Sequence, residues 1–249
     1  MNRAAGRKRN SLPALVFWLC LWQIGAMAMG NALLLPTPVQ VLRCLGNLAL
    51  TASFWQMTFT SIGRVLLGVA LGILLAVLLA VITVKWHIVD LLISPMLTAM
   101  QATPVASFAI LVLIWLDRDY VPVLICTMMV LPVVHTSVST GIRMTDPQLL
   151  EMAGIYRLPR LRTLTRIYVP SVLPFFRASC VSALGLGWKA GIAAEVLTVP
   201  KASIGRMISE SKLYLLTEEL FAWTLTVVVL SLLLQKVILK LLAGRGGHA

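Results

Sequence analysis

Residues 58–84 read TFTSIGRVLLGVALGILLAVLLAVITV, a continuous apolar run in which Arg64 is the only charged residue. A helix needs about 20 apolar residues to cross the roughly 30 Å hydrocarbon layer of a bilayer. Gly68 and Gly72 add the small-xxx-small spacing that lets two membrane helices approach closely. The stretch therefore predicts a transmembrane helix packed against a neighbour.

The composition of the whole chain points the same way. Of its 249 residues, 59% are hydrophobic and 12% are charged, and the mean hydropathy is +0.92. A soluble fold of this composition would expose large apolar patches, which soluble monomers rarely do. The net charge of +12 is typical of nucleic-acid binding in soluble proteins, but in membrane proteins Lys and Arg collect on cytoplasmic loops. We therefore expect membrane lipid, and no nucleic acid, around this chain.

Five further runs of suitable length are bounded by charges, glycine or proline. Together they predict an all-α, polytopic membrane protein with six transmembrane helices, at about 12–30, 58–84, 89–116, 120–140, 170–197 and 220–242. These helices form one membrane domain, 12–242, between a basic leader, 1–11, and a tail, 243–249. Residues 39–55 are amphipathic and are expected to lie at the outer interface.

The first run has an alternative interpretation as a cleaved signal peptide. Ala26-Met27-Ala28 mimics a cleavage site. The apolar run is longer than a signal core, and an even number of spans agrees better with the later loops. A retained helix is therefore expected.

The positive residues predict the orientation. With a cytoplasmic amino terminus, thirteen of the 21 Lys and Arg residues fall in inside segments, five fall outside, and three lie within spans. Cytoplasmic loops carry the excess of positive charge. Both termini and the loop 141–169 are therefore expected in the cytoplasm.

Sequence patterns that would indicate chemistry are missing. There is no P-loop, so any ATP dependence must come from a partner. Nucleophile elbows, His-Glu-x-x-His and paired-carboxylate patterns are missing as well, so neither an enzyme nor a metal site is expected. The four cysteines, Cys20, Cys44, Cys126 and Cys180, form no CxxC pair and are expected to be small buried hydrophobic residues.

The loop 141–169 reads GIRMTDPQLLEMAGIYRLPRLRTLTRIYV. Thr145 or Asp146 can cap a helix that has Pro147 in its first turn, and Leu158-Pro159 is expected to end it. A second short helix would begin at Pro159 and end at Val169-Pro170, before the fifth span. Two short amphipathic helices would make a compact docking surface, whereas the alternative is an ordinary solvated basic loop.

This loop resembles a known motif. Glu151-Met152-Ala153, followed by Ile167-x-x-Pro170, is similar to the "EAA" coupling loop of binding-protein-dependent ABC importer permeases. The family pattern has a glycine six residues after the glutamate, where this chain has Arg157. The resemblance implies that the first short helix inserts into a cleft on the ATPase subunit, and that the residues of the coupling set are Glu151, Met152, Ala153, Gly154, Arg157, Ile167 and Pro170.

Other segments extend the resemblance along most of the chain. Pro36-Thr-Pro38, Gln101-Ala-Thr103-Pro104 and the stretch 187–195, GWKAGIAAE, are similar to permeases of the nitrate, sulfonate and taurine importer group. The resemblance implies a type I ABC importer permease fold with a cytoplasmic coupling helix, in the bacterial inner membrane.

The same resemblance implies the partners. They are two ATPase subunits that hold ATP and Mg, an external solute-binding protein, and a second copy of the chain, while the chain itself binds no cofactor. The expected solute is a small anion. The alternative is a standalone secondary transporter or channel, which would need its own coupling-ion site near the bilayer midplane.

Ionisable residues inside spans are the remaining candidates for function, because each costs about 2.5 to 3.5 kcal/mol near the bilayer centre on insertion scales. Lys189 either lines the translocation path and attracts an anion, or reaches a structural partner or the interface. The same alternatives apply to Arg64 and Glu195. The complete set of path candidates is Lys189, Gln101, Thr103, Trp188, Glu195 and Arg64. His135 is expected to be a hydrogen-bonded structural residue.

Overall fold

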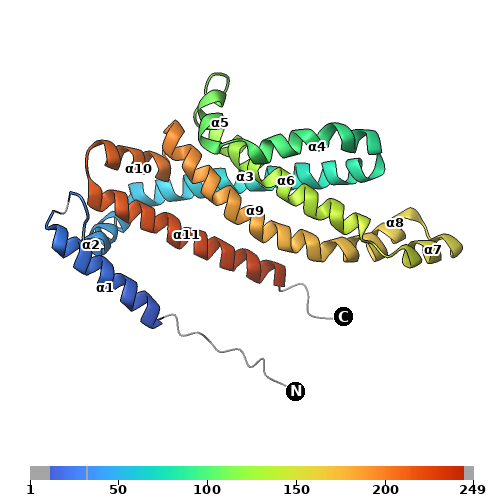
Figure 1. Ribbon diagram of the computed structural model, residues 1–249, viewed down its shortest axis with the longest axis horizontal. Helices are drawn as coiled ribbons and strands as arrows, with labels where there is room; N and C mark the ends of the chain where they lie inside the picture. The colour runs from blue at the N-terminus through green and yellow to red at the C-terminus, as the bar shows by residue number, and fades with distance from the viewer. Residues whose placement is uncertain (1–11, 32, 244–249) are drawn as a thin grey trace, which may run out of the picture.

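The computed structural model describes residues 12–31 and 33–243, and the regular structure in those ranges is helical throughout. The helices form an elongated bundle (Figure 1). In chain order they are α1 Leu12–Met29, α2 Pro38–Ala49, α3 Ala52–Lys85, α4 His87–Ala102, α5 Val105–Val112, α6 Val121–Arg143, α7 Pro147–Ile155, α8 Arg160–Thr163, the π-helical turn η1 Leu164–Tyr168, α9 Val169–Thr198, α10 Ile204–Leu213 and α11 Thr217–Ala243. The predicted leader 1–11 and, apart from Ala243, the predicted tail lie outside the described residues.

Helices α3, α6 and α9 run side by side along the bundle and form its centre (Figure 1). Glycines make this packing close. A Cβ atom added at Gly68 would lie 2.5 Å from the Cβ of Cys126 on α6, and one at Gly191 would lie 2.6 Å from the Sγ of the same cysteine. A Cβ at Gly68 or Gly72 would also lie within 3.0 Å of a backbone carbonyl of α6, so the small-xxx-small spacing allows the close approach that was predicted.

Four helical units are long and apolar enough to span a bilayer: α3, α6, α11 and the continuous unit Arg160–Thr198. α4 and α5 together form a fifth candidate span, which bends by 104° at Thr103-Pro104. Thr103 is extended there, as the residue before a proline tends to be. The predicted third span is thus broken into two helices, and α1 contributes a shorter apolar stretch, Val16–Met29.

The prediction that Val169-Pro170 separates the second loop helix from the fifth span is wrong. The chain passes from α8 through η1 into α9 without ending the helix, and the Val169 N–H bonds to the Leu164 carbonyl five residues back. Pro170 sits in the first turn of α9, where a missing N–H is tolerated. The wide π turn avoids the clash that a proline ring causes inside a regular helix.

Two smaller expectations also change. The predicted amphipathic segment 39–55 is divided, because α2 ends at Ala49 and Thr51 caps the start of α3. Cys126 and Cys180 are buried as predicted, but Cys44 is only half-buried. Cys20 is exposed, since the described part of α1 packs mainly on α2. Apolar character alone did not distinguish a buried face from one that faces lipid.

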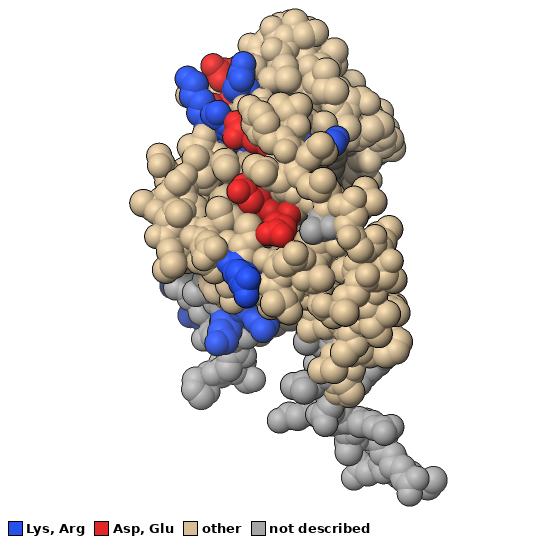
Figure 2. Space-filling model, turned by 90° about the vertical axis from the view of Figure 1, so that its left-hand side faces the viewer, with Lys and Arg blue, Asp and Glu red and all other residues tan. Residues whose placement is uncertain are grey.

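The two ends of the bundle differ in character. The end formed by α2, α10 and the loop 117–119, called the α10 end below, carries acidic and basic side chains, and Figure 2 shows them against an otherwise uncharged surface. The opposite end, called the α7 end, carries α7, α8 and the hairpin between α3 and α4 (Figure 1). Candidate sites lie at both ends.

Candidate functional site

The α7 end presents a short helix built by local signals. Asp146 is the N-cap of α7, and its Oδ1 accepts a hydrogen bond from the Gln148 N–H at 2.9 Å. Pro147 occupies the first turn, where it lacks only an N–H that would have no partner in the helix. The predicted helix and its cap are therefore confirmed, with Asp146 rather than Thr145 as the capping residue.

The end of α7 explains how Arg157 replaces glycine. Arg157 has φ +45°, in the left-handed region. The Arg157 N–H bonds to the Gly154 carbonyl at 3.0 Å, and the Leu158 N–H bonds to the Ala153 carbonyl at 2.9 Å. This pair of bonds is a Schellman motif, which usually has glycine at the left-handed position. The turn geometry is thus kept at the cost of backbone strain at Arg157.

An apolar surface on α7 is left uncovered by the described part of the chain. Ile155 is 79% exposed, Tyr156 73% and Met152 44%, whereas Ala153 is buried. Glu151 is exposed on the same helix. These four exposed residues are called the α7 face below. Exposed apolar groups that gather beside a charge are typical of a protein–protein contact.

Outside the α7 face, the remaining residues of the predicted coupling set lie in two environments. Gly154, Arg157 and Pro170 are exposed, whereas Ile167 is buried in η1, where it anchors the segment to the bundle. The coupling role itself remains a prediction.

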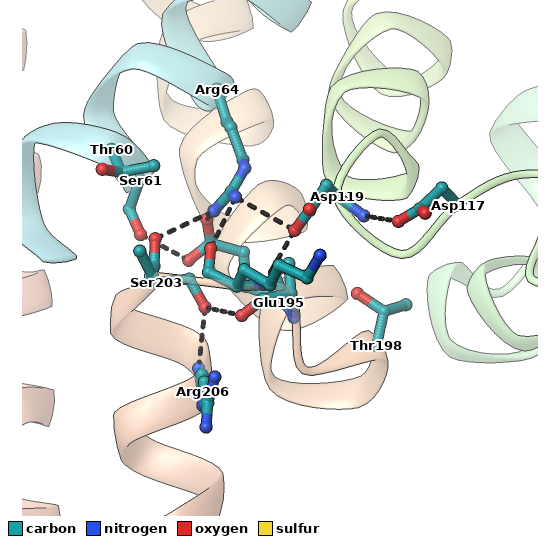
Figure 3. A network of polar contacts seen from close by, with 12 residues as sticks. Thr60, Ser61, Arg64, Asp117, Asp119, Glu195, Thr198, Ser203 and Arg206 are labelled. Carbon is teal, nitrogen blue, oxygen red and sulfur yellow. Dashed lines mark hydrogen bonds and ion pairs between the residues drawn. The ribbon is translucent and has the colours of Figure 1, made fainter.

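The α10 end holds a cluster of polar side chains from distant parts of the sequence (Figure 3). Arg64 of α3 lies 3.2 Å from Asp119, which precedes α6, and 3.6 Å from Glu195 of α9. Its guanidinium also donates to the carbonyls of Lys201 and Ala202, at 2.6 and 3.1 Å. One arginine thus joins α3, the loop before α6, α9 and the loop before α10.

Glu195 is fully buried, at 0% exposed, and is held by more than the arginine. Its Oε2 accepts from the Ser61 hydroxyl at 2.7 Å and from the Gly205 N–H at 3.2 Å. Gly205 lies in the first turn of α10, where unpaired N–H groups favour an anion. A Cβ at Gly205 would collide with the Glu195 Cβ and backbone, so only glycine lets α10 approach this carboxylate.

Backbone strain borders the same cluster. Val199 and Ala202 have φ values of +47° and +46°, and a β-branched residue rarely adopts this conformation. The Lys201 N–H donates to Asp119 Oδ1 at 2.7 Å, which fixes the loop between them. The surrounding contacts therefore hold a strained turn in place.

The remaining path candidates are not brought together. Lys189 lies on an exposed face of α9, whereas Trp188 is buried and its Nε1–H donates to the Val227 carbonyl of α11 at 3.2 Å. Thr103 forms the break between α4 and α5. Gln101, two residues earlier on α4, lines a cavity.

That cavity lies between α4 and α6 and is called the α4–α6 cavity below. It has a volume of about 330 Å³, and its lining residues are Asp90, Ser94, Leu97, Thr98, Gln101, His135, Thr136, Ser139, Thr140 and Arg143. At the α7 end of the bundle, Arg143 Nη2 lies 2.7 Å from Asp90 Oδ2. His135 is buried, and its Nε2 lies 3.0 Å from the Thr83 hydroxyl, which agrees with the hydrogen-bonded histidine predicted from the sequence.

Comparison with known proteins gives these features a context. A family model described as "Binding-protein-dependent transport system inner membrane component" matches residues 68–244, well over half of the chain. The chain belongs to this family. The permease is therefore an inner-membrane component of an ABC importer, and it is not itself an enzyme, because the ATPase of such a transporter is a separate subunit.

Individual relatives agree with this assignment. The permease is 24% identical over 230 residues to a protein named as the aliphatic sulfonates transport permease SsuC of Bacillus subtilis (strain 168), with 89% of this chain and 82% of the relative covered. It is 21% identical over 220 residues to the taurine transport system permease protein TauC of Escherichia coli (strain K12), with 86% and 80% covered. Both relatives are named as transport permeases, in agreement with the family to which the chain belongs.

A solved structure shows the same fold. The crystal structure of an amino acid ABC transporter with histidines contains a chain that matches the permease with a TM-score of 0.60, over 77% of this chain and 91% of that one. Sequence identity is 14%, so the likeness concerns the fold alone.

The residues that pair with the predicted site residues were not predicted from the sequence. Asp119 and Ser61 complete the cluster around Arg64 and Glu195, and Asp90 pairs with Arg143. α10 was also missed inside a predicted outer loop, although Ser203 followed by Ile204 is a helix-start signal, and the Ser203 hydroxyl does accept from the Arg206 N–H at 3.0 Å.

Proposed function

We propose that this permease imports a small solute of the sulfonate or taurine type, by coupling ATP-driven closure of a separate ATPase pair to rearrangement of its own helices. The observation that carries the proposal is the α7 face, which is apolar, exposed and built on a capped helix that joins α6 to α9. An exposed apolar face beside a charge suits a contact with a protein partner. ATP and Mg would be bound by that partner rather than by this chain.

Continuity between α8 and α9 supports a transmission role. Arg160–Thr198 forms a single unit of 39 residues, which at 1.5 Å per residue is about 58 Å long. A displacement applied beside α7 would therefore reach Glu195 and the α10 end. Changing a two-state equilibrium from 1:99 to 99:1 requires about 5.5 kcal/mol of differential binding, which nucleotide-dependent closure of the ATPase pair would supply.

The proposed topology places the α7 end in the cytoplasm and the α10 end outside. With α1 as a spanning helix, the permease would have six spans and both termini inside, in agreement with the distribution of positive charge. α10 and the loops near it would then receive the external solute-binding protein.

A second copy of the permease is proposed to complete the path. One side of α9 is exposed along its length, through Ala178, Ser182, Leu186, Lys189, Ala193 and Leu197. The charge of Lys189 is costly on a face that meets lipid. A homodimer with the path between the two copies would remove that cost.

Purification from the native membrane tests the proposal. A tagged permease is expected to copurify with an ATPase subunit, and proteoliposomes are expected to take up solute only with ATP and the binding protein. Glu151→Cys in a chain without its own cysteines should react with a membrane-impermeant thiol reagent only after the cells are opened. Solute uptake by the permease alone would instead favour the standalone transporter.

A further inference from the structure

One residue that lines the α4–α6 cavity has a hydroxyl group without a hydrogen-bond partner. Ser139 is 8% exposed, and its buried Oγ has no hydrogen-bond partner among the residues that the structure describes. A buried hydroxyl without a partner costs about 1 to 3 kcal/mol. Groups of this kind require a specific explanation, and a ligand in the cavity would provide one.

Other lining groups supply acceptors as well as donors. The hydroxyls of Thr98, Thr136 and Thr140 donate to carbonyls of their own helices at 3.0, 2.8 and 2.7 Å. Their oxygens keep free lone pairs, whereas Ser139 and the Gln101 amide add donors. The cavity can therefore accept hydrogen bonds from a solute and also donate to it.

Opposite charges lie at one end of the cavity. Asp90 and Arg143 both line it and pair at 2.7 Å, and Gln101 lies eleven residues beyond Asp90 on α4, about 16 Å along the helix. At about 330 Å³, the volume is at the small end of ligand pockets. The lining thus combines a charged pair at one end with neutral hydrogen-bonding groups along its length.

We propose that the α4–α6 cavity binds a small zwitterion, with its oxyanion on Arg143 and Ser139 and its ammonium on Asp90. This proposal rests on the proposed function and specifies its solute class. A plain anion on Arg143 would lie beside the Asp90 carboxylate, and like charges brought together in a contact repel each other. A zwitterion replaces both partners at once.

The site is also tied to the coupling segment. Arg143 is the last residue of α6, and Asp146, the N-cap of α7, follows three residues later. A solute that engages Arg143 therefore acts directly on the connection that leads to the ATPase.

Two probes that differ by one group test the proposal. Taurine carries a sulfonate and an ammonium, whereas ethanesulfonate has the same sulfonate without the ammonium. Equilibrium binding would be measured on the permease with its ATPase subunits in lipid nanodiscs. We expect taurine to bind at least about tenfold more tightly than ethanesulfonate, since a hydrogen bond to a charged group is worth roughly that factor, and Asp90→Asn should remove the difference.

Serine variants separate ligand binding from folding. Ser139→Ala should weaken taurine binding about tenfold, while thermal stability stays the same or rises, because an unpaired buried hydroxyl is removed. The matched control is Ser179→Ala, at a buried serine of α9 whose hydroxyl donates to the Phe176 carbonyl. That variant should keep the affinity for taurine and lose some stability.

Three results would overturn the proposal: equal affinity for both probes, unchanged taurine affinity in Ser139→Ala, or binding of neither probe by a complex that hydrolyses ATP. In each case the ATPase partner and the importer assignment would stand. Failure to find any ATPase partner would instead overturn the proposed function.

Discussion

Arg64 of α3 and Glu195 of α9 form an ion pair at the α10 end, with Nη1 and Oε1 3.6 Å apart. Glu195 is fully buried, and Arg64 is the described cation that faces it. Contacts within the chain thus account for both charges. A buried pair of this kind adds little net stability, but removing one partner leaves the other charge uncompensated.

Replacing Arg64 should therefore cost more than replacing Glu195. Arg64→Gln leaves a buried carboxylate and should lower the free energy of unfolding by about 3 kcal/mol. Glu195→Gln leaves a neutral side chain that still accepts from Ser61 and Gly205, and should cost about 1 kcal/mol. Thermal unfolding of the purified permease in detergent would measure both losses.

The control for this comparison is Arg206→Gln. Arg206 pairs with Glu210 at the surface of α10, and an exposed pair of this spacing contributes less than about 0.5 kcal/mol. Equal losses of unfolding free energy in Arg64→Gln and Arg206→Gln would show that the buried pair contributes no more to stability than the exposed pair.

Gly205 should tolerate no side chain. In Gly205→Ala the added Cβ would overlap the Glu195 Cβ and backbone, and overpacking of this kind costs about 1 to 3 kcal/mol or more. Gly63→Ala on α3 is the matched control, since nothing lies within 4 Å of its added Cβ, and alanine should stabilise the helix by up to about 1 kcal/mol. Opposite shifts in melting temperature are expected, and shifts of the same sign would contradict the packing seen here.

Local sequence signals predicted much of this fold, but they did not predict the ion pairs between residues that are far apart in the sequence. Apolar length located α3, α6, α9 and α11 to within six residues at each end, and the Asp146-Pro147 start predicted α7, because both depend on neighbours in the chain. The Arg64–Asp119 and Asp90–Arg143 pairs join residues far apart in sequence. A charged residue inside an apolar run is expected to have a partner. The identity of that partner depends on how the helices pack, which hydropathy does not predict.

The same contrast holds for the coupling segment. The resemblance identified Glu151-Met152-Ala153, yet the departure at Arg157 could be interpreted only once its φ was known. Val169-Pro170 misled the prediction because a proline can start a helix as well as end one, and the π turn that decides between them has no strong sequence signal.

Arg157→Gly should stabilise the end of α7. A left-handed conformation costs a non-glycine residue about 1 to 2 kcal/mol, whereas glycine adopts it freely. We expect slower amide hydrogen exchange at Leu158, whose N–H closes the Schellman motif. Arg160→Gly, placed at the start of α8 in an ordinary helical conformation, should instead speed local exchange. Identical behaviour of the two variants would argue against strain at Arg157.

Ile155→Glu should weaken binding to the ATPase without affecting the folding of the permease. Ile155 is largely exposed on the α7 face, so a charge there should change the free energy of unfolding by less than about 0.5 kcal/mol. If this face docks into the ATPase, the buried glutamate would weaken that contact by at least about 2 kcal/mol, or roughly thirtyfold. Copurification of the ATPase would measure the loss, with Leu213→Glu at the exposed end of α10 as the control that keeps its ATPase. If the Ile155→Glu permease folds and still copurifies with the ATPase, the ATPase binds a different surface.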